Sequence, residues 1–426
     1  MTTLKAVRGT RDLLPPETDL WNRIEATARS VFSRYNFGEI RTPVFEDTGL
    51  FARGVGEETD IVSKEMYTWE DRARAQSEKT QSLTLRPENT AGVVRAYIEH
   101  KLGETGQLQK LYYIGPQFRR ERPQKGRYRQ FSQIGAEVIG PTSAGSESPL
   151  RDAEVLEMLA TLLDELGITG WTLHINSVGS SADRARYNDT LREALIPWAP
   201  KMCVDCQRRA VTNPLRVLDC KVPEDQPIIE TLPKIVDSLD EDSKTHFAAV
   251  TAALDAAEVP YTRNHRLVRG LDYYTRTTFE FTHGGLGAQN ALLGGGRYDG
   301  LSEAIGGPKA PGIGFAMGED RLVLTLQALH AAAAEKADAY IAPLGELVNA
   351  AALALARELR RSGLRVELGD GSFRLKKSFD AADKTAKRIV ILGEDELQSG
   401  ILTVKDFATG IQTKVPRTEL AAVLAK

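Results

Sequence analysis

The sequence predicts an α+β fold with three parts. An antiparallel sheet flanked by helices should occupy residues 1–330, interrupted by a helical insertion at 180–259, and a small α/β domain should follow at 338–426. Two strand-like segments frame a charged turn between residues 111 and 139, which indicates a long antiparallel hairpin. The insertion is polar and lacks long strand patterns, whereas strands and helices alternate beyond residue 338. At 426 residues, the chain is long enough for about three domains.

The first predicted element is an amphipathic helix, Asp19–Tyr35, followed by a strand, Glu39–Phe45. Apolar residues recur at helical spacing on one face of this helix: Trp21, Ile24, Ala28, Val31 and Phe32. Pro43 has no backbone N–H to donate within the strand, so we expect the strand at a sheet edge or an interface.

Glu88 lies between the predicted strand Ser82–Leu85 and the predicted helix Ala91–Leu102. Because Pro87 restricts Arg86 to extended backbone, it fixes the direction in which Glu88 points. Later elements of this part follow from the same periodicities. They are the strands Leu111–Ile114 and Phe131–Ile139, a polar loop at 140–149, the helix Asp152–Leu166, and the strands Trp171–Asn176 and His265–Val268.

The C-terminal domain should follow an alanine-rich linker at 331–337. Alternation of strand and helix predicts a largely parallel core. The expected elements are strands Ala339–Ala342, Arg365–Leu368 and Arg388–Leu392, a helix Val348–Arg361, and a short helix near Asp380.

The turn of the long hairpin is the most highly charged stretch of the chain, with six cations and one carboxylate from Arg119 to Arg129. Guanidinium groups from two strands can hold phosphates from more than one side, which suits a bound nucleotide. The alternative is a solvated charged loop. The net charge is only −3, so contacts with nucleic acid must come from local basic patches.

The N-terminal residues 1–5 lack an apolar leader, and no apolar run reaches about 18 residues. We therefore expect a cytoplasmic protein without a membrane segment. All three cysteines lie in the insertion: Cys203, Cys206 and Cys220. The first two have the spacing of zinc ligands, but no histidine or fourth cysteine nearby completes a tetrahedral set. Reduced thiols are the favoured interpretation, zinc is the alternative, and no metal ligand is assigned.

Two glycine-rich stretches, 294–300 and 312–318, contain neither a Walker A pattern nor a dinucleotide-binding fingerprint. They could form tight turns, or let a flat adenine or a small amino acid approach the backbone. Their neighbours Arg297, Tyr298 and Arg321 favour the second interpretation.

Four motifs carry a resemblance to a known family. The segment Phe118–Phe131, with Gly135-Ala136-Glu137, resembles the second signature motif of class II aminoacyl-tRNA synthetases, in the form that histidyl-tRNA synthetases carry. Arg269–Arg276 and Gly294–Leu301 resemble two histidine-specific motifs, and Gly312–Leu322 resembles the third class motif. With Arg8–Asp12, the resemblance covers almost the whole chain.

The resemblance implies a class II catalytic domain with a helical insertion and a C-terminal anticodon-binding domain. It also implies a homodimer, because the helix–strand–proline unit around Pro43 forms the dimer interface in this class. The expected substrates are L-histidine, ATP with Mg²⁺ on its phosphates, and tRNA(His). The expected reaction makes histidyl-adenylate and then transfers histidine to the 3′ end of the tRNA.

Site residues follow from the same motifs. Arg119 is expected to hold the α-phosphate, Arg321 the γ-phosphate, and Arg269 to bridge the substrate carboxylate and the α-phosphate; these three are the expected catalytic residues. Arg127 is also assigned to ATP, and Glu121 to the adenine amino group. The expected tRNA contacts are Gln124, Lys125, Arg374, Lys376 and Lys377.

The histidine substrate needs acceptors for its ammonium group and polar partners for its ring. A buried carboxylate and a phenol reject apolar side chains because those leave them unpaired. By resemblance, the ammonium faces Glu88, Thr90 and Gln133, and the ring faces Glu137, Tyr274 and Tyr298. Glu137 could instead face solvent, and Tyr274 and Tyr298 could be ordinary core tyrosines. Each of the three arginines could instead be a structural salt-bridge partner.

Two positions depart from the family pattern: Asn89 stands where glycine is usual, and Ser132 where histidine is common. Asparagine tolerates a positive φ, so the turn after Glu88 need not change. Two other functions remain as alternatives. One is the non-catalytic regulatory subunit of ATP phosphoribosyltransferase, and the other is a class II synthetase for a different amino acid.

Overall fold

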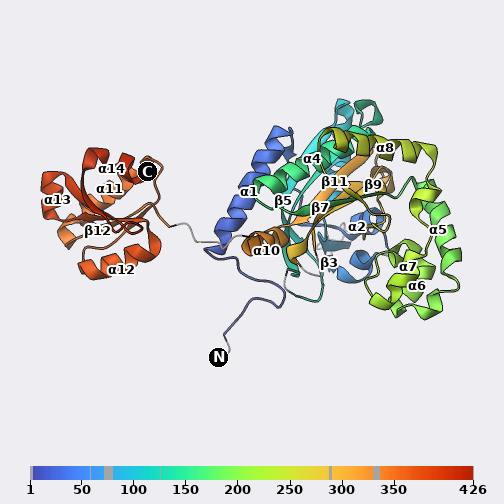
Figure 1. The fold of residues 1–426 in the computed structure, drawn as a ribbon, viewed down its shortest axis with the longest axis horizontal. Helices are drawn as coiled ribbons and strands as arrows, with labels where there is room; N and C mark the ends of the chain where they lie inside the picture. Colours follow the sequence, from blue (N-terminus) through green and yellow to red (C-terminus); the bar gives the residue numbers. More distant parts are fainter. Residues whose placement is uncertain are drawn as a thin grey trace. The chain divides into compact units, whose positions relative to one another are not determined.

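The computed structural model describes residues 3–57, 59–71, 80–124, 126–286, 290–329 and 336–425. The chain divides into two compact units, Met1–Ala332 and Ala333–Lys426 (Figure 1). None of the helices in the described ranges is long and apolar enough to cross a membrane.

The first unit is organised around an eight-stranded sheet in the order β1-β5-β6-β11-β10-β9-β7-β8. Its pairs are antiparallel except at the two edges, where β1 runs parallel to β5 and β8 parallel to β7. The strands are β1 (Gly38–Glu39), β5 (Gln109–Phe118), β6 (Gln130–Ile139), β7 (Trp171–Ser177), β8 (Thr262–Arg263), β9 (Thr275–His283), β10 (Ala291–Arg297) and β11 (Gly312–Gly318). The predicted long hairpin is confirmed, with β5 and β6 paired from Gln109 opposite Ile139 to Phe118 opposite Gln130.

One face of this sheet packs against helices α1 (Glu17–Arg34), α4 (Pro149–Glu165), α8 (Glu241–Ala256) and α10 (Glu319–Leu329). Alternate residues of β6, namely Ile134, Ala136 and Val138, belong to that core. Because side chains alternate along a strand, Gln133 and Glu137 point to the opposite face. The predicted apolar face of α1 is confirmed, since all five of its predicted residues are buried.

Smaller elements cover the rest of the first unit. A three-stranded antiparallel sheet has the order β2-β4-β3. Its strands are β2 (Phe45–Asp47), β3 (Tyr67–Asp71) and β4 (Gln81–Leu85), and the nearby helices are α2 (Thr48–Val55), α3 (Thr90–Glu99) and α9 (Leu301–Ala304). The helices α5 (Ser181–Leu195), α6 (Val204–Thr212) and α7 (Gln226–Glu230) share a separate apolar core.

The second unit contains a five-stranded sheet in the order β13-β12-β14-β15-β16. The first three strands are parallel, as predicted, but an antiparallel hairpin, β15–β16, extends the sheet and was not predicted. The strands are β12 (Ala339–Pro343), β13 (Val366–Leu368), β14 (Arg388–Leu392), β15 (Ile401–Asp406) and β16 (Gln412–Pro416). The helices are α11 (Asn349–Arg361), α12 (Leu375–Thr385), α13 (Glu394–Ser399) and α14 (Leu420–Leu424).

The predicted strand His265–Val268 is wrong. Residues 264–270 form turns and irregular backbone between β8 and β9. Leu267 and Val268 are nevertheless buried, because this connection passes over the apolar interior. A short apolar run therefore indicated burial here and not strand pairing.

Candidate active site

A cavity of about 250 Å³ opens on the sheet face opposite the helices of the main core. Its walls come from the β5–β6 hairpin, the start of α3, the connection after residue 268, and strands β9, β10 and β11. It brings together most of the predicted site residues: Glu88, Thr90, Arg119, Glu121, Arg127, Gln133, Arg269, Tyr274 and Arg321.

Glu88 caps the first turn of α3 from inside the cavity. Its two carboxylate oxygens accept hydrogen bonds from the backbone N–H groups of Thr90 at 2.8 Å and Ala91 at 2.9 Å. Burial raises the pKa of Glu88, while these backbone donors act in the opposite direction. Nearby, Gln133 Oε1 has no hydrogen-bond partner among the described residues. The cavity thus offers acceptors that could receive a substrate ammonium group.

Glu137 and Tyr298 lie beneath the cavity and do not line it. The Tyr298 hydroxyl donates to Glu137 Oε2 at 2.6 Å, and Thr90 Oγ1 donates to Glu137 Oε1 at 2.7 Å. Both Glu137 and Tyr298 are buried. Burial raises the pKa of Glu137 to about 8, although these two hydrogen bonds lower it. Thr90 therefore connects this buried pair to the cavity wall.

Residues 294–297 and 312–318 are strands, whereas residues 299 and 300 form a turn, and the strand glycines make room for side chains. A Cβ atom on Gly314 would overlap the carboxylate of Glu137, and one on Gly294 would overlap the guanidinium of Arg269. A Cβ atom on Gly312 would likewise overlap the ring of Tyr298. The bare backbone of β10 and β11 thus lets polar groups lie flat against the sheet.

Glu121 lies between two arginines at the turn end of the hairpin. Arg127 Nη1 is 3.1 Å from Glu121 Oε2, and Arg119 Nη1 is 3.9 Å from Glu121 Oε1. Arg119 is also held by the carbonyl of Pro87 at 2.9 Å and lies over the ring of Phe131. These contacts fix the Arg119 guanidinium at the cavity wall.

Arg269 and Arg321 bring positive charge from other elements. Arg269 Nη1 contacts Glu280 Oε1 at 2.7 Å, and Arg321 Nη1 donates to the carbonyl of Ala291 at 2.7 Å. Burial lowers the pKa of Arg321, and the like charge of Arg127 acts in the same direction. Repulsion between these two guanidinium groups would be relieved by an anion between them.

Four polar residues of the cavity wall have no role predicted from the sequence: Tyr128, Tyr273, Glu280 and Asp320. Glu280 lies on β9 directly opposite Gly294, and alternation with the buried Phe279 and Phe281 places it on the cavity face. That alternation was visible in the sequence. In contrast, the predicted neighbour Arg297 is fully buried against Asp152 and Asp299 and lines no part of the cavity.

The predicted tRNA contacts lie elsewhere. Gln124 is exposed at the hairpin turn, where its backbone pairs with Arg127, and Lys125 lies outside the described residues. The other three, Arg374, Lys376 and Lys377, are exposed at the start of α12 in the second unit.

The two departures from the family pattern also lie outside the cavity wall. Asn89 has a φ of −120°, so the argument from positive φ does not apply. Its Oδ1 accepts a hydrogen bond from Thr42 Oγ1 at 2.6 Å, which ties the start of α3 to the segment before β2. Ser132 lies on β6 opposite Pro116 of β5, and its side chain interacts with the buried carboxyl of Glu319, whose pKa is raised by burial and lowered by this contact.

This sheet and its arginine-lined cavity are those of a class II aminoacyl-tRNA synthetase catalytic domain. The family model described as histidyl-tRNA synthetase matches residues 9–322, and the model described as anticodon binding domain matches residues 338–426. The chain belongs to the histidyl-tRNA synthetase family.

Individual relatives match this chain over nearly its full length. The histidine–tRNA ligase of Koribacter versatilis (strain Ellin345) is 74% identical over 419 residues, covering 98% of this chain and 95% of the relative. The crystal structure of apo S. aureus histidyl-tRNA synthetase matches with a TM-score of 0.79 at 38% identity, covering 100% of both chains. An ATP phosphoribosyltransferase regulatory subunit/histidyl-tRNA synthetase from Bacillus halodurans C matches with a TM-score of 0.64 at 21% identity over 92% of this chain and 99% of that one. This last match shows likeness of fold alone.

Proposed function

We propose that the chain is a histidine–tRNA ligase, which activates L-histidine with ATP and transfers it to tRNA(His). The observation that carries this proposal is the single cavity in which Arg119, Arg269 and Arg321 face the acceptors Glu88 and Gln133. Positive charge and ammonium acceptors are the two requirements for bringing an amino acid against a nucleotide.

Activation joins two anions, the substrate carboxylate and the α-phosphate of ATP. A carboxylate oxygen attacks the α-phosphorus, the bond to the bridging oxygen breaks, and pyrophosphate leaves. Fixed guanidinium groups stabilise the charge that develops on the α-phosphate oxygens, and they stay protonated throughout. In this scheme Arg119 holds the α-phosphate, Arg269 bridges both anions, and Arg321 and Arg127 hold the outer phosphates.

The carboxylates of the cavity wall already have partners within the protein. Glu121 pairs with Arg127, Glu280 pairs with Arg269, and Glu88 accepts from backbone N–H groups. Among the described residues, these carboxylates are not part of a cluster with metal-ligand geometry, and we assign Mg²⁺ to the phosphates of the bound ATP.

Histidine selection is assigned to the residues beneath the cavity. Glu137 and Tyr298 are buried and pair with each other, and Thr90 links Glu137 to the cavity wall, so we assign recognition of the imidazole ring to this hydrogen-bonded set. Tyr274, on the wall, completes the ring site, while Glu88, Thr90 and Gln133 receive the ammonium. Glu121 is assigned to the adenine amino group.

The proposal extends to a homodimer and to tRNA binding. The strand predicted over Glu39–Phe45 is wrong, because β1 ends at Glu39 and residues 40–44 form no strand. Among the described strands, β1 pairs with β5 alone, and the exposed Val44 and Phe45 after it support an interface there. Gln124 and Lys125 are assigned to the acceptor end of tRNA(His). The second unit is assigned to the anticodon, through Arg374, Lys376 and Lys377.

Pyrophosphate exchange with each of the twenty amino acids tests the function directly. Labelled pyrophosphate should enter ATP only when histidine is present. Exchange that depends on another amino acid would contradict the substrate assignment. No exchange with any amino acid would favour the regulatory-subunit alternative.

A further inference from the structure

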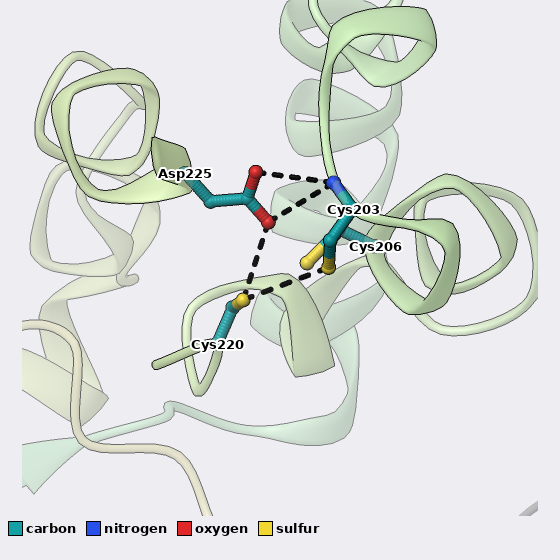
Figure 2. A group of neighbouring side chains, drawn as sticks. All are labelled: Cys203, Cys206, Cys220 and Asp225. Atoms are coloured by element: carbon teal, nitrogen blue, oxygen red, sulfur yellow. Dashed lines mark hydrogen bonds between the residues drawn. The ribbon is translucent and has the colours of Figure 1, made fainter. Parts of the chain in front are cut away.

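Three thiols and one carboxylate converge in the part of the first unit that contains α5, α6 and α7 (Figure 2). Cys203 precedes α6 and Cys206 lies in its first turn, whereas Cys220 and Asp225 come from the segment before α7. The four ligand atoms lie within 4.8 Å of one another. Cys203 Sγ is 3.9 Å from Cys220 Sγ, which is 3.2 Å from Asp225 Oδ2.

These separations fit one small metal ion. A tetrahedron with Zn–S bonds of about 2.3 Å has edges of about 3.8 Å, close to the separation between Cys203 and Cys220. The same separation is far longer than the bond of about 2.0 Å in a disulfide. Asp225 supplies the fourth ligand that sequence reasoning did not find, because it looked only for cysteine and histidine.

The carboxylate of Asp225 is buried and, within the described ranges, forms no ion pair with lysine or arginine. Its oxygens accept the backbone N–H of Cys203, at 3.1 and 3.3 Å, and the thiol of Cys220, and the thiols of Cys203 and Cys206 also interact with this carboxylate. A buried charge without a cation is costly, and a metal ion would supply the missing positive charge.

Backbone N–H groups also contact two of these four side chains. The N–H of Val222 points at Cys220 Sγ at 3.4 Å, and the Cys203 N–H points at Asp225. Such outer donors stabilise negative charge on metal ligands and fix their direction. Cys206, Cys220 and Asp225 are buried while Cys203 is half-buried, so an ion could enter from the side of Cys203.

We propose that Cys203, Cys206, Cys220 and Asp225 form a structural zinc site. Four protein ligands close the coordination shell, which assigns the ion a structural and not a catalytic part. It would join the start of α6 to residues 220–225. Cys220 also borders a cleft of about 740 Å³ that shares Arg127 and Arg321 with the candidate active site. The zinc would therefore brace one wall of that cleft.

Metal analysis of the full-length, tag-free protein tests the proposal. After growth with added zinc and extensive dialysis, we expect about one zinc per chain. Asp205→Asn is the matched control, because this exposed carboxylate lies within the same Cys203–Cys206 motif and outside the cluster. It should keep its zinc, whereas Cys206→Ser should lose it.

Substitutions at Asp225 test whether this residue is a metal ligand or only a hydrogen-bond acceptor. Asp225→Asn should bind zinc at least about 10-fold more weakly, whereas Asp225→Cys and Asp225→His should restore binding because each supplies another good ligand. A carboxylate that only accepts the thiol of Cys220 would show no such rescue. Equal zinc binding by Asp225→Asn and the unmodified chain would overturn the four-ligand assignment.

If the variants fail to fold, the unmodified chain still decides the question. Titration with an organomercurial should release zinc in step with modification of the three thiols. Replacement by Co²⁺ should give a thiolate-to-cobalt charge-transfer band and the strong visible absorption of a tetrahedral site. Zinc-free protein that stays folded and gives no such cobalt spectrum would overturn the proposal, as would bound iron in place of zinc.

Discussion

Tyr298 donates its hydroxyl hydrogen to Glu137 across 2.6 Å, and neither side chain reaches the cavity surface. The hydrogen bond orients the carboxylate, and Thr90 holds its other oxygen. A buried carboxylate with two donors keeps one position in the absence of substrate, so this hydrogen-bonded set is organised before any ligand binds.

Replacing Glu137 with glutamine should change how stability depends on pH. Burial raises the pKa of Glu137 to about 8, so the folded chain keeps a proton that the unfolded chain loses near the ordinary value of 4.5. Stability from this group is therefore complete below about 4.5 and decreases as pH rises toward about 8. The slope is at most about 1.4 kcal/mol per pH unit.

Urea denaturation of both proteins across this range measures the effect. The free energy of unfolding of the unmodified chain, relative to Glu137→Gln, should decrease as pH rises. Glu319, whose pKa burial also raises to about 8, is present in both proteins and cancels in the difference. A pH-independent difference would show that Glu137 does not titrate in this range.

Gly314→Ala should damage the histidine site without touching any arginine of the cavity. The new Cβ would overlap the Glu137 carboxylate, and overpacking of this kind costs about 1–3 kcal/mol. We expect a lower melting temperature and a raised KM for histidine, with the KM for ATP little changed. Gly300→Ala is the matched control, because a Cβ there meets open space. Equal effects of the two substitutions would refute the steric argument.

Arg269→Ala should reduce the rate of adenylate formation by a much larger factor than it reduces the affinity for ATP. In the proposed mechanism its charge lies where the carboxylate and the α-phosphate meet, and loss of one such group costs about 10²- to 10³-fold in rate. Histidine-dependent pyrophosphate exchange gives the rate, and Arg266→Ala in the same connection, paired with Glu230, serves as control. Near-normal exchange by Arg269→Ala would remove this residue from the mechanism.

Neutralising Arg374, Lys376 and Lys377 together should weaken tRNA binding and leave histidine-dependent exchange intact. Each lost phosphate contact should reduce the slope of log affinity against log salt by up to about one unit. Lys384→Ala is a suitable control, because this exposed lysine lies at the other end of α12. Unchanged affinity and slope in the triple variant would place the tRNA contacts elsewhere.

Hydrophobic periodicity correctly predicted the elements whose buried residues follow a regular pattern in the local sequence. The five apolar residues of α1 are all buried, and β14 has the predicted bounds, Arg388–Leu392. The predicted strand His265–Val268 is wrong because two apolar residues in a row are compatible with a buried connection as well as with a strand. The β15–β16 hairpin was missed because its residues show weaker alternation.

Site residues that lie in a recognisable motif could be predicted from the sequence. Residues that only the tertiary structure brings to a site could not. Arg119, Arg269 and Arg321 come from three separate motifs, and the structure places them on one cavity. Glu280 and Asp225 belong to no such motif. They acquire partners only through sheet register and through the packing of a helical segment, which a single sequence does not display.

Arg184 of α5 donates to the carbonyls of Asp272 and Tyr274, at 2.7 and 2.6 Å. The Arg184 guanidinium thus fixes the backbone of the segment between β8 and β9 in which Arg269 lies. Coupling free energies are reciprocal, so if a shift of α5 changes substrate affinity through this contact, bound substrate resists that shift to the same extent. Through Arg184, α5 is therefore linked to the backbone segment that forms part of the cavity wall.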